Sequence, residues 1–279
     1  MAEPALAVLY ATLLWWLSTA LILRLDRLSR RTFRWSLAGT TLLALAALAG
    51  LAWSRDADGP AAAYLAFTCG LMVWGWNEVA FLLGYLTGPR LEASPPGSGP
   101  GRRFLHAVQA ILWHELALLA SGAIVLALVW GGSNPTGLWV LVLLWLMRTS
   151  AKLNLHLGVP NPGDGLLPDH LRHLASFFAR RPMNPLFPLS ITVATLALAR
   201  LVDLAVEAPT GSLEATMWTL LATLATLGLL EHWLMVLPVP ETALWGWALK
   251  GRDHHHRPLA PAPLLPATEP VGRARGRTA

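Results

Sequence analysis

The sequence predicts an all-α membrane protein, a polytopic bundle of about seven transmembrane helices with the N-terminus outside and the C-terminus inside. Apolar residues make up 54% of the chain and charged residues only 13%, whereas soluble domains carry about a quarter charged residues. Several apolar runs reach the roughly 20 residues that a bilayer-spanning helix needs. The net charge is +5, but its arginines lie between the apolar runs. They therefore favour contact with a lipid bilayer over nucleic acid.

The predicted spans are apolar runs bounded by linkers rich in charge and turn residues. They cover Ala5–Leu23, Phe33–Trp53, Ala61–Leu86, Phe104–Trp130, Gly137–Leu157, Pro185–Leu204 and Leu213–Leu237. The sixth run is short and contains Arg200 and Asp203. Together the runs define a transmembrane domain over residues 1–250. Residues 251–279 are rich in Pro, Ala and Arg and predict a disordered cytoplasmic tail.

The distribution of basic residues predicts the orientation. Arginines gather in the first, third and fifth linkers and in the C-terminal tail, whereas the other linkers hold only Arg55. Cytoplasmic loops carry an excess of Lys and Arg. The alternation therefore predicts an odd number of spans, with the arginine-rich linkers on the cytoplasmic side.

Polar side chains inside four of the spans are the candidates for a functional site, because ionisable groups are costly in hydrocarbon. All of them fall in the predicted cytoplasmic half of the bilayer, so we expect one shared site that opens towards the cytoplasm. They are Glu78, His114, Glu115, Arg148, Lys152, Asn154, His156, Glu231 and His232.

The spacing within the fifth span sharpens this expectation. Arg148, Lys152 and His156 follow one another at intervals of four residues, which places them on one face of a helix. We expect this basic stripe to face the carboxylates of the other spans.

The linker 158–184 is expected to cap the site. Asp169 could cap a short amphipathic helix there, with His170 and His173 as neighbours on it. The apolar side of that helix would hold Leu171, Leu174, Phe177 and Phe178.

Three interpretations of the cluster remain open, and none identifies a catalytic residue. The first is an ion-pair network that fixes helix packing. The second is capture of a ligand such as a tetrapyrrole, whose central metal a histidine can coordinate; its candidate residues are Glu78, Arg148, Lys152, Asn154, His170 and His173. The third is a redox metal site of the kind that holds non-haem iron; its candidate ligands are His114, Glu115, Glu231 and His232.

Several stretches resemble the photosynthetic complex assembly protein 2 family (PuhE type) of purple phototrophic bacteria. The resemblance extends over Leu13–Trp247 and is carried by Leu13–Leu23, Ala63–Arg90, Trp113–Leu118, Arg148–Asn161, Leu167–Pro188 and Leu229–Pro240. It implies a protein of the bacterial inner membrane, cytoplasmic or intracytoplasmic, encoded among photosynthesis genes.

The resemblance implies assembly of the photosynthetic reaction centre and its light-harvesting antenna, or supply of bacteriochlorophyll to them. The leading hypothesis is therefore an assembly factor that binds reaction-centre and antenna subunits, a tetrapyrrole pigment, or both. The alternative is a membrane metalloenzyme that uses non-haem iron to act on a pigment or quinone precursor.

Overall fold

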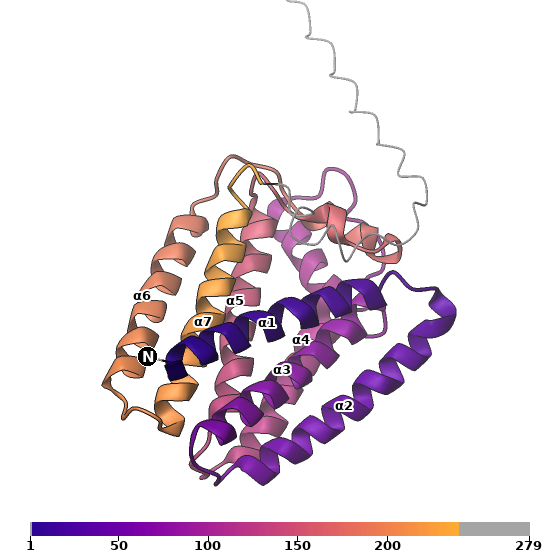
Figure 1. The fold of residues 1–279 in the computed structure, drawn as a ribbon. Helices are drawn as coiled ribbons and strands as arrows, with labels where there is room; N and C mark the ends of the chain where they lie inside the picture. The colour runs from indigo at the N-terminus through magenta and orange to yellow at the C-terminus, as the bar shows by residue number, and fades with distance from the viewer. Residues whose placement is uncertain (1, 240–279) are drawn as a thin grey trace, which may run out of the picture. The chain divides into compact units, whose positions relative to one another are not determined.

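The computed structural model describes residues 2–239 and shows an all-helical bundle (Figure 1). Its seven long helices are α1 (Ala2–Leu25), α2 (Phe33–Ser54), α3 (Pro60–Leu82), α4 (Pro100–Val129), α5 (Thr136–Leu157), α6 (Leu186–Glu207) and α7 (Leu213–Leu234). Each is long and apolar enough to cross a membrane. This confirms the predicted fold class of a multi-pass membrane protein, while the predicted orientation stays a prediction. The predicted tail 251–279 lies outside the described residues.

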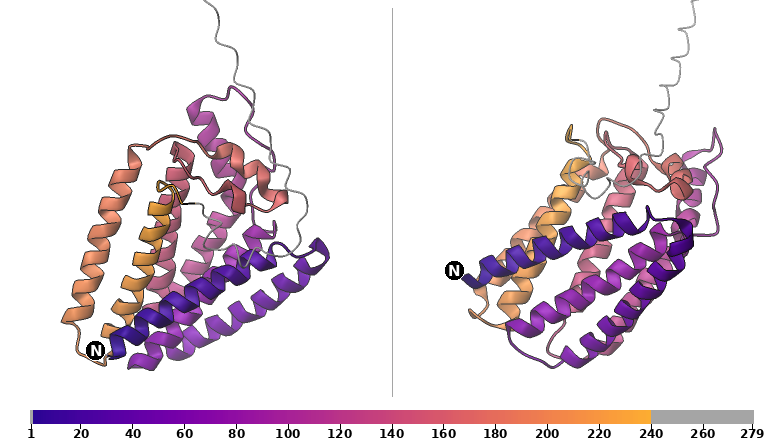
Figure 2. Two further views of the ribbon diagram at one scale, coloured as in Figure 1. Left: turned by 45° about the horizontal axis from the view of Figure 1, so that its top comes forward. Right: turned by 45° about the vertical axis from the view of Figure 1, so that its right-hand side comes forward.

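Helix α3 is the centre of the bundle and α6 is its edge. In the most apolar window of α3, 67% of residues are buried, whereas the value for α6 is 0%. Helix α3 packs against α1, α2, α4, α5 and α7. Helix α6 packs mainly on α7, and Figure 1 and the left view of Figure 2 show it at the edge of the bundle. Polar side chains that meet on α3 are therefore shielded by its neighbours.

The three arginine-rich linkers lie together at one end of the bundle, which we call the basic end (Figure 1). It carries three short 3₁₀ segments, η1 (Arg30–Thr32), η2 (Asp164–Leu166) and η3 (Asp169–Phe177). Segment η3 lies at this end and packs against α4. The capping role expected for the linker 158–184 stays a prediction.

Helix α3 ends at Leu82, four residues before the predicted end of the third span at Leu86. Gly84 has a φ of +86° and turns the chain back. The amide nitrogens of Tyr85 and Leu86 both donate to the carbonyl of Ala80, which closes the helix. The prediction was wrong because the residues after Leu82 are still apolar, and hydropathy alone does not detect a positive-φ glycine.

The predicted amphipathic helix after Pro168 is a 3₁₀ helix, and Asp169 does not cap it. Pro168 is its N-cap residue, and no side chain bonds the free amides. A 3₁₀ helix repeats every three residues. Leu171, Leu174 and Phe177 therefore form one face, and all three are buried against the bundle.

Candidate functional site

Two ion pairs connect the basic face of α5 to its neighbours. Arg148 donates from Nη2 to Oε2 of Glu78 on α3 at 3.3 Å, and Lys152 donates from Nζ to Oε1 of Glu115 on α4 at 2.5 Å. The four-residue spacing of the two cations directs both to the α3–α4 side of α5. His156, the third member of the predicted stripe, instead packs edge-on against the ring of Phe104.

The Arg148–Glu78 pair is buried on one side and open on the other. Glu78 is only 7% exposed, but the Arg148 side chain is 44% exposed. Glu231 on α7 is also exposed, and it interacts electrostatically with both Arg148 and Glu78. An anchored arginine and a carboxylate that remains open therefore lie within the membrane-spanning helices. We call Glu78, Arg148 and Glu231 the charged triad.

His114 lies fully buried beside the charged triad. Its Nε2 is 3.8 Å from Oε1 of Glu78, and its ring packs on Phe81 with 4.5 Å between centroids. Neither ring nitrogen has a hydrogen-bond partner. The backbone nitrogen of His114 donates to the carbonyl of Thr87 at 3.1 Å. The chain after α3 therefore runs back along α4 at the depth of the imidazole.

His232 is fully occupied by structural hydrogen bonds. Its Nδ1 donates to the carbonyl of Gly228 at 2.8 Å, which leaves Nε2 to accept from the Ser150 hydroxyl at 3.0 Å. Asn154 plays a similar part, because its amide donates to the hydroxyl of Ser190 at 2.9 Å and so connects α5 to α6. Ser150 and Ser190 were missed in the sequence, since a serine in an apolar run carries no distinguishing pattern.

The four residues proposed as metal ligands are held apart by these contacts. Glu115 pairs with Lys152, His232 is bonded to Ser150, and His114 lies nearest to Glu78. Over residues 2–239 the structure contains no group of three or more His, Cys, Asp or Glu side chains that could hold a metal ion. The arrangement of the described residues does not fit non-haem iron.

The histidines within the spans are not placed to coordinate a tetrapyrrole, whereas ligand capture through His170 and His173 stays a prediction. His114 is enclosed on all sides, and both ring nitrogens of His232 are engaged. Neither can offer a nitrogen to the central metal of such a pigment. What the charged triad can do is form ion pairs and hydrogen bonds with a group that approaches from the open side of the bundle.

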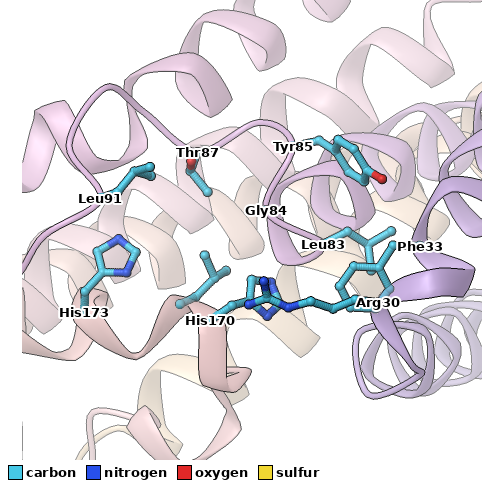
Figure 3. A pocket seen from close by; sticks show the side chains of 10 residues that line it. Arg30, Phe33, Leu83, Gly84, Tyr85, Thr87, Leu91, His170 and His173 are labelled. Atoms are coloured by element: carbon cyan, nitrogen blue, oxygen red, sulfur yellow. The ribbon is translucent and has the colours of Figure 1, made fainter.

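His170 and His173 do not join the charged triad. Phe81, Leu171 and Leu174 belong to one buried apolar cluster at this end of the bundle. His170 and His173 instead line a separate hollow of about 380 Å³ at the basic end (Figure 3). Burial lowers the pKa of both imidazoles below the usual value, so both are largely neutral at pH 7.

The fold and these contacts define a multi-pass helical membrane protein with a charged network inside its spanning segments. The chain belongs to the family described as "Protein of unknown function (DUF3623)", which matches residues 1–256. It is 40% identical over 276 residues to the "Uncharacterized 30.4 kDa protein in puhA 5'region" of Rhodobacter capsulatus, a match that covers 98% of this chain and 100% of that protein. No solved structure matches the chain.

Proposed function

We propose that this protein is an assembly factor for the photosynthetic reaction centre and light-harvesting antenna, and that its charged triad contacts the transmembrane helices of their subunits. The carrying observation is the exposure of Arg148 and Glu231 inside spans that otherwise face lipid. A charged group in hydrocarbon is stabilised only by a partner, and a polar group on a neighbouring helix supplies one.

The photosynthetic context comes from the relative. Its name places it in the puhA 5' region of Rhodobacter capsulatus. The alignment spans nearly the whole of both chains, so the two proteins share the same spans and not merely one segment. We extend the context of the relative to this chain on that ground.

Glu231 is the residue that we expect to contact the partner helix. It is exposed, and no side chain in the described part of the molecule accepts or donates a hydrogen bond to it, whereas Glu78 and Glu115 already bond to cations. A helix that brings a hydroxyl, an amide or a basic group to this level would satisfy Glu231 and leave the Arg148–Glu78 pair intact. The site thus favours binding over chemistry.

Deleting the gene in its phototrophic host tests the proposal. We expect assembled reaction centre and antenna to fall several-fold, measured by native gel and by the absorption of the assembled complexes. Extractable pigment should still be made. A gene copy with Glu231→Gln should not restore the levels of the assembled complexes. A gene copy with Glu207→Gln, which changes an exposed carboxylate at the far end of α6, should restore them.

Two outcomes would count against the proposal. If the deletion strain lacked the pigment and accumulated one precursor, the membrane enzyme would be the better interpretation. If complex levels were unchanged, the protein would have no part in assembly.

A further inference from the structure

The hollow at the basic end is enclosed by three segments that are far apart in the sequence (Figure 3). Segment η1 and the start of α2 supply Arg30 and Phe33, and η3 supplies His170 and His173. The chain that leaves α3 supplies the remaining wall, which includes Leu83, Gly84, Tyr85, Thr87 and Leu91. Its volume of about 380 Å³ falls at the lower end of the range for small-ligand pockets, roughly 300–1,000 Å³.

The polar groups of this hollow suit an anion. Its lining residues include Arg30, His170, His173, Tyr85 and Thr87, and none of the lining residues is acidic. Arginine binds phosphate oxygens through two parallel N–H bonds. A protonated imidazole carries an N–H on both ring nitrogens, so it can donate one hydrogen bond beyond the one that it makes to the backbone.

The walls of the hollow are held in place before any ligand arrives. The Nε2 of His170 donates to the carbonyl of Leu82 at 2.8 Å, which satisfies an acceptor at the end of α3. A Cβ at Gly84 would lie 3.2 Å from Cδ2 of His170, so the glycine permits this close approach. The Nε2 of His173 is buried without a hydrogen-bond partner, and this vacant polar atom is available to a ligand.

The position of the hollow matches the level of lipid headgroups. It lies where α1 and α3 end and α2 begins, beside exposed Arg27, Arg31 and Arg34. Trp35 is 68% exposed, and the Arg34 guanidinium lies 5.2 Å from its ring centroid. Exposed tryptophan beside arginine is typical of the membrane–water interface.

We propose that this hollow binds a phosphate group, held by Arg30, with His170 and His173 as further donors once their imidazoles are protonated. The phosphate can belong to the headgroup of an anionic phospholipid or to a small phosphorylated compound in solution. This site is independent of the charged triad and of the proposed role in assembly.

The proposal implies stronger binding at lower pH. The charged and titratable groups around His170 are Arg30 from η1, Tyr85 from the segment after α3, and Asp169 and His173 from η3 itself. Asp169 is bonded to Arg172 at 2.9 Å and faces solvent, so the balance at the hollow is cationic. Burial lowers the pKa of His170 and His173, so both are neutral at pH 7 and gain positive charge only when the pH falls below that pKa.

The test compares Arg30→Gln with Arg31→Gln in the full chain. Both arginines are exposed on η1, but only Arg30 lines the hollow. Native mass spectrometry of protein in neutral detergent would count bound phosphatidylglycerol, with phosphatidylcholine as the zwitterionic control. We expect Arg30→Gln to weaken phosphatidylglycerol retention roughly fivefold, and Arg31→Gln to change it little. His173→Asn should reduce the gain in retention that acid brings.

Competition identifies the source of the phosphate. If millimolar inorganic phosphate displaces the lipid, the site recognises the phosphate group alone. If the lipid is retained, its glycerol and acyl chains contribute to binding, and the site is a headgroup site. Both results support the proposal. Equal losses in Arg30→Gln and Arg31→Gln would overturn it.

Discussion

The Glu78 carboxylate is held in the bundle by a cation that is itself partly open. Removing one partner of a buried ion pair typically costs about 3–5 kcal/mol, because the remaining charge stays uncompensated. Arg148→Met should therefore lower the unfolding temperature in detergent by roughly 6–10 °C. The lower end of the cost is the better guide, since the Arg148 side chain is 44% exposed.

A double variant separates the loss of the pair from simple misfolding. Glu78→Gln combined with Arg148→Met removes both charges and should recover most of the lost unfolding temperature. Arg200→Met is the matched control, because its pair with Glu207 is exposed on both sides and such pairs contribute about 0–1 kcal/mol. A double variant no more stable than Arg148→Met alone would show that the charge balance does not matter.

Asp26 is a second costly carboxylate, and it lies outside the spans, just after α1. It is 5% exposed, and neither carboxylate oxygen has a hydrogen-bond partner. Burial raises its pKa from the ordinary value of 3.8 to about 7. The folded state therefore binds a proton that the unfolded state has released, and stability falls as the pH rises between these two values.

Asp26→Asn should remove this pH dependence. We expect its unfolding temperature to match that of the natural protein near pH 4 and to exceed it by several degrees at pH 8. Glu92→Gln, at an exposed position in the linker after α3, should leave the pH profile unchanged. Parallel pH profiles for Asp26→Asn and the natural protein would show that Asp26 is not protonated in the fold.

The sequence revealed the individual charges better than their pairing. The four-residue spacing of Arg148 and Lys152 was enough to predict a basic face of α5. Arg148 pairs with Glu78 and Lys152 with Glu115 because of the way α3 and α4 pack around α5. Sequence periodicity carries no information on that packing. The sequence did not mark Asp26 as buried, because a carboxylate between arginines in a linker is expected to face solvent.

Helices α3 and α5 approach closely at a pair of glycines. A Cβ at Gly70 would lie 2.8 Å from the carbonyl oxygen of Gly137 and 3.1 Å from Cβ of Val140. Gly70→Ala must therefore push the two backbones apart. Small residues of this kind permit helices to pack in membranes, where no hydrophobic effect drives them together.

Gly70→Ala should destabilise the bundle by about 1–3 kcal/mol, the usual cost of overpacking. Gly122→Ala is the control, because nothing lies within 4 Å of the added Cβ and alanine is the better helix former. Thermal unfolding in detergent should place the first variant below the natural protein and the second at or above it. Equal unfolding temperatures for the two variants would rule out a tight α3–α5 contact.

The helices themselves were largely predictable, because bilayer thickness fixes the length of the apolar run. The six other spans end within about four residues of their predicted limits, as hydropathy allows. Segment η3 was predicted as an amphipathic helix with the correct buried leucines, but its 3₁₀ geometry was not. The hollow beside it was beyond sequence reasoning, since its walls come from three segments that meet only in the folded chain.

The complete molecule combines two polar features at different levels. The charged triad lies within the spanning helices, and the hollow lies at the basic end. The predicted cytoplasmic location of the basic end rests on the arginine pattern alone. In this account the bundle presents a membrane-embedded contact to partner helices and a headgroup-level site to a phosphate.

Co-purification of the protein from native photosynthetic membranes tests the central claim most directly. Tagged natural protein, Glu231→Gln and Glu207→Gln would be isolated in mild detergent and their bound subunits identified by mass spectrometry. The account predicts that reaction-centre or antenna subunits accompany the natural protein and Glu207→Gln, and that Glu231→Gln loses most of them while it still folds. Recovery of the same subunits in the same amounts with Glu231→Gln would contradict it.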